Sequence, residues 1–157
     1  MRHQSLLHGL GIALAAALTL IAVGSVAQDK EAQLKARQDF MEHQQKDVDA
    51  INAYAKGQGD KATALDKAND LIAVAPKIVD QFPPGTSSKD FPKSKAKPEI
   101  WEEWDKAKLL PAKLQEQEEK LVEVIKTGTP QQAGEEMRSV YRNGCNGCHG
   151  PYRVPSH

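Results

Sequence analysis

Two cysteines and a histidine lie close together near the end of the chain, in the sequence Cys145-Asn146-Gly147-Cys148-His149, and the chain has no other cysteine. This C-x-x-C-H spacing is the attachment pattern of c-type haem. On a helix, positions i, i+3 and i+4 share one face, so both thiols can reach the vinyl groups on one porphyrin edge while the imidazole approaches the iron. The pattern predicts one covalent haem c, held by Cys145 and Cys148, with His149 as the proximal iron ligand.

Three other interpretations of these residues fit less well. A structural zinc site takes four ligands, and only three candidates cluster here. A thioredoxin-like redox pair belongs to a strand–helix pattern, and no strand pattern precedes these cysteines. A disulfide between Cys145 and Cys148 would close a very small loop and would stabilise the fold little.

A second axial ligand of the iron has to come from upstream, because eight residues follow His149. Met41 is the leading candidate, since it lies on an apolar stripe that recurs every seven residues as Leu34, Met41, Val48 and Ala55. Thioether sulfur is a known haem ligand that raises the reduction potential. Met41 can equally be a core residue that packs against the far face of the haem.

Two polar residues precede Met41 on the same predicted helix. Arg37 lies one turn before Met41, where its guanidinium can pair with a haem propionate in a charge-assisted hydrogen bond. The alternative is a surface arginine paired with a helical neighbour. Gln38, at the adjacent position, can assist Arg37 in binding the propionate. His43 lies about 200° around the helix from Met41, so we expect it to face solvent.

Hydrophobic periodicity divides the chain into four helical stretches, and no alternating strand pattern is present. Gly57 ends the first stretch, Asp60 is a candidate cap for the second, and Gly128 ends the third. Pro76 and Pro111 are expected to kink the second and third helices. The four stretches are residues 29–56, 60–82, 98–127 and 129–149, with Ala133, Met137, Val140 and Tyr141 of the last one turned inward. This predicts an all-α fold, an antiparallel up-down-up-down four-helix bundle, with an irregular loop over residues 83–97.

Residues 1–27 have the features of a cleaved secretory signal peptide. A short basic start is followed by the uncharged run Leu10–Val23 and by small residues up to Ala27. The run is too short for a membrane anchor, because 14 residues reach roughly 21 Å against a hydrocarbon core of about 30 Å. We therefore expect a periplasmic domain at residues 28–157, without stable membrane insertion.

The charge balance of that domain gives no electrostatic reason to bind nucleic acid. The signal peptide contains Arg2 and no acidic residue, so the remainder keeps 20 Lys and Arg against 21 Asp and Glu.

The chain resembles a class II c-type cytochrome, the cytochrome c′ family. The resemblance rests on Arg37-Gln38-x-x-Met41, Phe82-x-Pro84-Gly85-Thr86, Lys97-Pro98-Glu99-Ile100-Trp101 and Cys145-x-x-Cys148-His149-x-x-Tyr152-Arg153. It implies a left-handed bundle with haem near one end, His149 as proximal ligand and Met41 on the distal side of the iron. It also implies that Arg37 and Gln38 lie by the propionates and that Arg153 lies near the proximal histidine.

The family contains two functional branches. Cytochromes c′ proper have a five-coordinate iron that binds nitric oxide or carbon monoxide, whereas in low-spin relatives a methionine at the position of Met41 completes a six-coordinate iron. We favour one-electron transfer through the Fe(III)/Fe(II) couple with periplasmic redox proteins as partners. Such a carrier turns over no substrate and is not an enzyme. Gas binding stays the alternative, and because relatives occur both as monomers and as dimers through their first two helices, a homodimer stays open.

Overall fold

The computed structural model describes the backbone of residues 10–155 and the side chains of residues 28–155. The signal peptide predicted at residues 1–27 and the terminal His157 lie outside the fully described residues, so the domain boundary stays a prediction. Within the described part of the chain, no helix is both long and apolar enough to cross a membrane.

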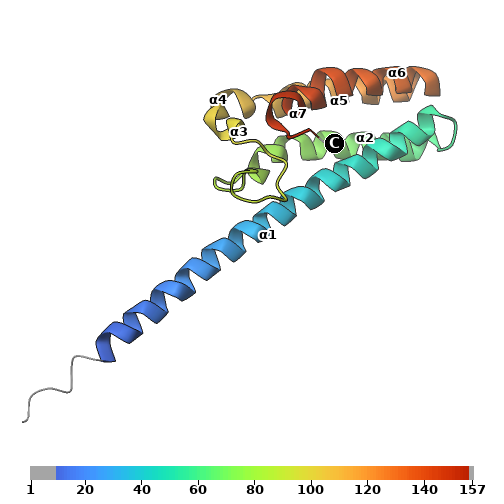
Figure 1. The fold of residues 1–157 in the computed structure, drawn as a ribbon. Coiled ribbons are helices and arrows are strands. Elements are labelled where there is room, and N and C mark those ends of the chain that lie inside the picture. Colours follow the sequence, from blue (N-terminus) through green and yellow to red (C-terminus); the bar gives the residue numbers. More distant parts are fainter. Residues whose placement is uncertain (1–9, 156–157) are drawn as a thin grey trace, which may run out of the picture.

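The described chain is helical from end to end, apart from its turns and one long loop. Its elements are α1 (Leu10–Ala55), α2 (Lys61–Val74), the 3₁₀-helix η1 (Ala75–Gln81), α3 (Glu99–Glu102), α4 (Trp104–Ala107), α5 (Leu110–Thr127), α6 (Pro130–Val140), the π-helical turn η2 (Tyr141–Cys145) and α7 (Asn146–Tyr152). They form four rods: α1, then α2 with η1, then α5, then α6 with η2 and α7 (Figure 1). Each rod packs against the next and α6 returns to α1, which closes the square of an up-down-up-down bundle and confirms the predicted fold class.

Local signals in the sequence set the ends of these rods. Gly57 has φ of 72°, a left-handed conformation that glycine adopts without strain, and it ends α1. The Asp60 side chain accepts a hydrogen bond from the Thr63 backbone N–H and so caps α2. Thr129 and Gln132 form a reciprocal capping box at the start of α6.

Pro76 and Pro111, which were both expected to kink a helix, have different effects in the structure. At Pro76 the second rod tightens from α-helix into the 3₁₀-helix η1, which agrees with the expected kink. The prediction of one continuous third helix from Pro98, kinked at Pro111, is wrong, because the segment is divided into α3, α4 and α5. Glu103 leaves the helical region at φ −108° and ψ 31°, and Pro111, which has no N–H to give to the preceding turn, lies in the first turn of a new helix.

The core runs along the axis of the bundle and is mostly aliphatic. Its largest fully buried members are Ile51, Leu121, Ile125 and Val140. Tyr141, which was expected to turn inward, does not pack in the core: it is 59% exposed, and it lines a cavity between the rods. It begins the π-helical turn η2, whose wider turn changes the phase of the side chains that follow Val140.

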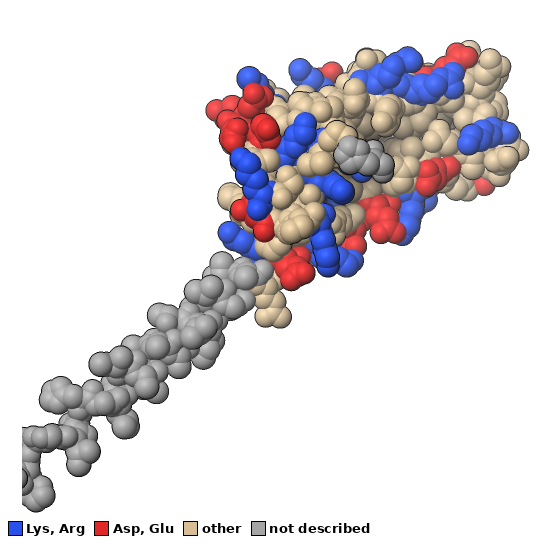
Figure 2. All heavy atoms as spheres, in the orientation of Figure 1, with Lys and Arg blue, Asp and Glu red and all other residues tan. Residues whose placement is uncertain are grey.

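The visible surface carries charges of both signs. Figure 2 shows Lys and Arg interspersed with Asp and Glu over this face, without a large patch of one sign.

Candidate functional site

Two adjoining cavities open between the rods at the end of the bundle where the long loop crosses. Their volumes are about 260 and 380 Å³, one just below and one in the lower part of the range of about 300–1,000 Å³ for small-molecule and cofactor sites. Both are lined by Met41, Phe82, Cys148, His149 and Arg153, so they are two parts of one divided space. Aliphatic and aromatic side chains from α2, η1, α3, α4, α5 and α6 supply most of the wall of the first cavity.

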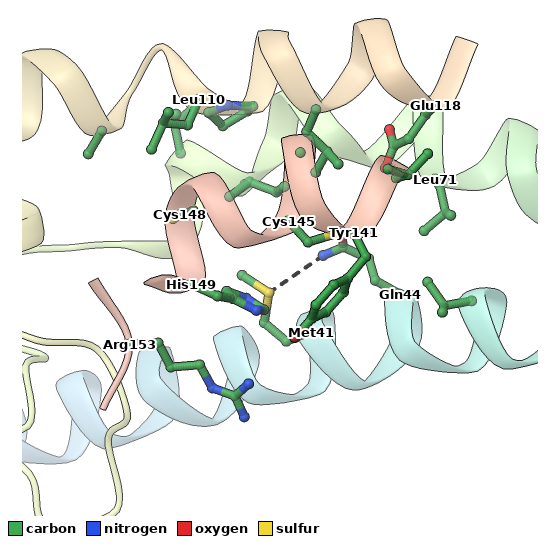
Figure 3. A pocket seen from close by; sticks show the side chains of 18 of the residues that line it. Met41, Gln44, Leu71, Leu110, Glu118, Tyr141, Cys145, Cys148, His149 and Arg153 are labelled. Atoms are coloured by element: carbon green, nitrogen blue, oxygen red, sulfur yellow. Dashed lines mark hydrogen bonds between the residues drawn. The ribbon is translucent and has the colours of Figure 1, made fainter. Parts of the chain in front are cut away.

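The last rod brings the C-x-x-C-H residues to this space on one helical face. Cys145 ends η2, Cys148 and His149 lie in α7, and all three line the first cavity (Figure 3). Both cysteines are free, partly buried thiols. Burial raises the pKa of each thiol to about 11, so both are protonated at neutral pH. The structure thus brings these three side chains to one cavity, and their attachment to a haem stays a prediction.

A glycine permits the close contact between this rod and α5. A Cβ added to Gly144 would lie 2.6 Å from Leu114 Cδ1, well inside van der Waals contact. Gly144 is buried directly before Cys145, so the absent side chain lets the cysteine-bearing turn pack against α5.

The environment of His149 favours a neutral imidazole. Burial, followed by the positive charge of Arg153, lowers the pKa of this histidine. The neutral ring has the lone pair that binds a metal. Arg153 itself is exposed and lines both cavities, and its backbone N–H donates to the His149 carbonyl at 3.2 Å. The prediction that Arg153 lies near the histidine agrees with this placement.

Met41 reaches the same space from the opposite rod. It is half-buried on α1 and lines both cavities, and Figure 3 shows its side chain directed from α1 toward the region of His149. Its Sδ accepts a hydrogen bond from Gln44 Nε2 at 3.6 Å. The structure thus brings the predicted distal and proximal residues to one cavity.

Arg37 has a role that the sequence did not indicate. Its side chain is not at the surface, because the residue is 5% exposed. Nη1 donates to Thr86 Oγ1 at 2.9 Å, and Nη2 donates to the Thr86 carbonyl at 2.8 Å and to Ser94 Oγ at 3.0 Å. The guanidinium also lies 5.0 Å from the centroid of the Phe82 ring. Arg37 therefore fastens the loop of residues 83–97 to α1, and pairing with a propionate stays a prediction.

Gln38 is exposed beside Arg37 and lines the second cavity. Its Nε2 donates to the Lys93 carbonyl at 3.2 Å, so it too contacts the long loop. The loop contacts of Gln38 leave its predicted place by the propionates untested.

His43 faces solvent as expected, and its Nε2 lies 2.6 Å from Asp70 Oδ2 on α2.

Glu118 is a cavity residue that the sequence did not indicate. This residue is 2% exposed on α5, lines the first cavity, and its Oε2 has no hydrogen-bond partner among the described protein atoms. Burial raises its pKa to about 7. A signal was present, because Glu118 falls on the buried stripe of Leu114, Leu121 and Ile125, where the spacing calls for an apolar residue.

Comparisons with known proteins agree with this geometry. The family model described as "Cytochrome C'" matches residues 32–153. The cytochrome c′ of Rhodobacter spheriodes is similar in structure, with a TM-score of 0.72 and 25% identity, covering 81% of this chain and 98% of that one. The cytochrome c′ of Thermochromatium tepidum has a TM-score of 0.68 and 23% identity, with coverages of 80% and 97%.

A third similar structure is the nitric oxide complex of a mutant of the cytochrome c prime from Alcaligenes xylosoxidans. It has a TM-score of 0.65 and 23% identity, and the match covers 80% of this chain and 97% of that one. No curated protein matches the chain.

Proposed function

Because the chain belongs to the cytochrome c′ family, whose members carry one covalent haem c with iron, we propose that it carries single electrons in the periplasm. The haem supplies the Fe(III)/Fe(II) couple when it is bound. Its partners are then periplasmic redox proteins, which deliver and accept the electron.

The residues of the cavity fit this cofactor. Cys145 and Cys148 offer two free thiols three positions apart, and each can form a thioether to one vinyl group. His149, neutral and on the same helical face, would bind the iron of the haem through its imidazole. The apolar walls exclude water from the ring, and Gln38 and Arg153 are the polar residues at the rim that suit its propionates.

The proposal of electron transfer rests on one observation: Met41 and His149 line the same cavities from opposite rods, which brings a thioether sulfur to the site. If the haem is bound there, the Met41 thioether and the His149 imidazole would both hold the iron. With both ligands supplied by the protein, the coordination would change little between oxidation states, so the reorganisation on electron transfer would be small. Sulfur ligation also raises the reduction potential.

A second candidate function is the capture of nitric oxide or carbon monoxide. It is favoured by the hydrogen bond that Gln44 donates to Met41 Sδ, which engages the sulfur within its own helix. A similar fold is known in complex with nitric oxide. In this case Met41 packs over an open iron and does not ligate it.

Substitution of Met41 separates the two candidates. If Met41 ligates the iron, Met41→Ala converts a low-spin spectrum into a high-spin one and creates carbon monoxide binding. Met137→Leu is the matched control, because Met137 is a buried methionine in the wall of the same cavity, on α6. A spin state that is unchanged in Met41→Ala contradicts ligation by Met41 and favours gas capture.

A further inference from the structure

Glu118 is an acidic residue in a place where apolar side chains are the rule. It lies on α5 between Leu114 and Leu121, both buried, and it is itself 2% exposed. Its Oε2 is fully buried without a hydrogen-bond partner among the described protein atoms. A buried carboxyl without a partner destabilises a fold, so its presence in the core calls for a functional explanation.

The carboxyl lies in the wall of the cavity that receives the haem. Glu118 and Cys145 line the same cavity, and the negative charge of Glu118 contributes to the raised pKa of the Cys145 thiol, which indicates that the two groups are close. Figure 3 shows Glu118 on the α5 side of the cavity, across from Met41 on α1. A group attached through Cys145 therefore lies near this carboxyl.

Few other titratable groups face the same space. The first cavity is lined from η2 and α7 by Tyr141, Cys145, Cys148 and His149, with Arg153 beyond the end of α7. The residues that α1, α2 and α6 contribute to it, among them Gln44, Leu71 and Met137, are uncharged. Once both thiols are thioethers and the imidazole is a ligand, these three groups no longer titrate near neutral pH. Among the described residues, Glu118 is then the one carboxyl in the wall of this cavity.

An electron added near a buried carboxyl changes the carboxyl's proton affinity. Negative charge placed close by, in surroundings of low dielectric constant, disfavours the carboxylate and favours the protonated acid. Thermodynamic linkage makes this effect reciprocal, so a proton on the carboxyl makes the iron easier to reduce by the same factor. Because burial already raises the pKa of Glu118 to about 7, the shift occurs near neutral pH.

Building on the function proposed above, we propose that Glu118 is a redox-linked proton site. When the iron goes from Fe(III) to Fe(II) by accepting one electron from a one-electron reductant, the Glu118 carboxylate takes one proton from water and forms an O–H bond. Oxidation reverses both changes: the electron passes to an oxidised partner and the proton returns to water. Glu118 acts in this scheme through its charge and is not an iron ligand.

Redox titration of the holoprotein over roughly pH 5–9, which brackets the range of a raised carboxyl, tests the proposal. We expect the midpoint potential of the unmodified protein to fall as pH rises through neutrality, with a slope approaching one proton per electron. Glu118→Gln keeps the size of the side chain and loses this dependence, whereas Glu119→Gln, an exposed neighbour, keeps it. Equal pH dependence in Glu118→Gln and in the unmodified protein overturns the proposal.

Reduced-minus-oxidised infrared spectra give a second readout that needs no variant. We expect the carbonyl band of a protonated carboxylic acid to appear on reduction in the unmodified protein and to be absent from Glu118→Gln. If the protein carries covalent haem but its spectra contain no such band, the proposal that Glu118 takes up a proton is overturned, and the proposed electron transfer still stands. A protein without covalent haem overturns the proposed function itself, so the two failures are distinguishable.

Discussion

The guanidinium of Arg37 holds Thr86 by two atoms, with Nη1 donating to the hydroxyl at 2.9 Å and Nη2 to the carbonyl at 2.8 Å. These contacts join α1 to the loop of residues 83–97, which crosses the end of the bundle. Phe82, just before that loop, lines both cavities and lies below the same guanidinium. The buried cation is therefore one of the contacts that hold the loop, together with the hydrogen bond from Gln38 to the Lys93 carbonyl and the backbone hydrogen bond from Val154 to Lys95.

Removal of this cation should destabilise the fold. We expect Arg37→Ala to lower the free energy of unfolding by about 2–4 kcal/mol, because hydrogen bonds to charged groups are strong and the acceptors on Thr86 and Ser94 lose their donor. Urea denaturation measures the change. Lys35→Ala is the control on the same helix, since it breaks an exposed ion pair with Asp39 and should cost less than about 1 kcal/mol. Equal losses of unfolding free energy in the two variants would contradict the proposed role of Arg37 in holding the loop of residues 83–97.

The contact between Gly144 and Leu114 gives a steric prediction. Gly144→Ala places a methyl group 2.6 Å from Leu114 Cδ1 and should destabilise the protein by roughly 1–3 kcal/mol. Gly150→Ala is the matched control on the same rod, because its Cβ comes no closer than 3.5 Å to another side chain. Thermal unfolding and the yield of covalent haem report the effect. We expect the double variant Gly144→Ala/Leu114→Ala to be less destabilised by the Gly144 change than the single variant is. A Gly144→Ala variant as stable as the parent would contradict a tight contact between Gly144 and Leu114.

Glu118 makes stability depend on pH in a defined direction. Its pKa in the folded protein, about 7, lies above its ordinary value of 4.5, so between these values the folded state binds more protons than the unfolded state. Stability from this group is therefore lost as pH rises from about 4.5 to 7, by roughly 3 kcal/mol in total. The advantage of Glu118→Gln over the unmodified protein should grow across that range in urea titrations. An advantage that is constant with pH would refute the raised pKa.

The capping box at the start of α6 should stabilise the rod that carries the haem motif. Thr129→Ala removes the hydrogen bond from the Gln132 backbone N–H and should cost about 1 kcal/mol. Thr127, two residues earlier, bonds the carbonyl of its own helix through its hydroxyl, so Thr127→Ala serves as a neighbouring control with a smaller expected loss. A Thr129→Ala variant as stable as the parent would contradict the cap.

The sequence predicted the features that depend on local spacing. Helical periodicity predicts that the C-x-x-C-H residues share one face of their own helix and that Met41 lies on the apolar stripe of the first helix, and all of them line the same cavity. The ends at Gly57, Asp60 and Thr129 follow from backbone chemistry that single residues carry. These features can be predicted without knowing which segments pack against them.

The features that the sequence did not predict depend on contacts between distant segments. Arg37 has the pattern of a residue near a cofactor edge, but its acceptors on Thr86 and Ser94 lie 49 and 57 residues away. Glu118 occupies an apolar position of its helix, and its burial becomes visible only when the other rods are in place. The break at Glu103 separates two helices of four residues each, which is too short for periodicity to resolve.

The absorption spectrum of the purified holoprotein, oxidised and reduced, before and after addition of carbon monoxide, tests the proposed electron transfer most directly. We predict sharp, split bands in the reduced state, a weak near-infrared sulfur-to-iron band in the oxidised state, and no response to the gas, because Met41 and His149 together close the iron. A broad high-spin spectrum that shifts when carbon monoxide is added would contradict electron transfer through a six-coordinate haem.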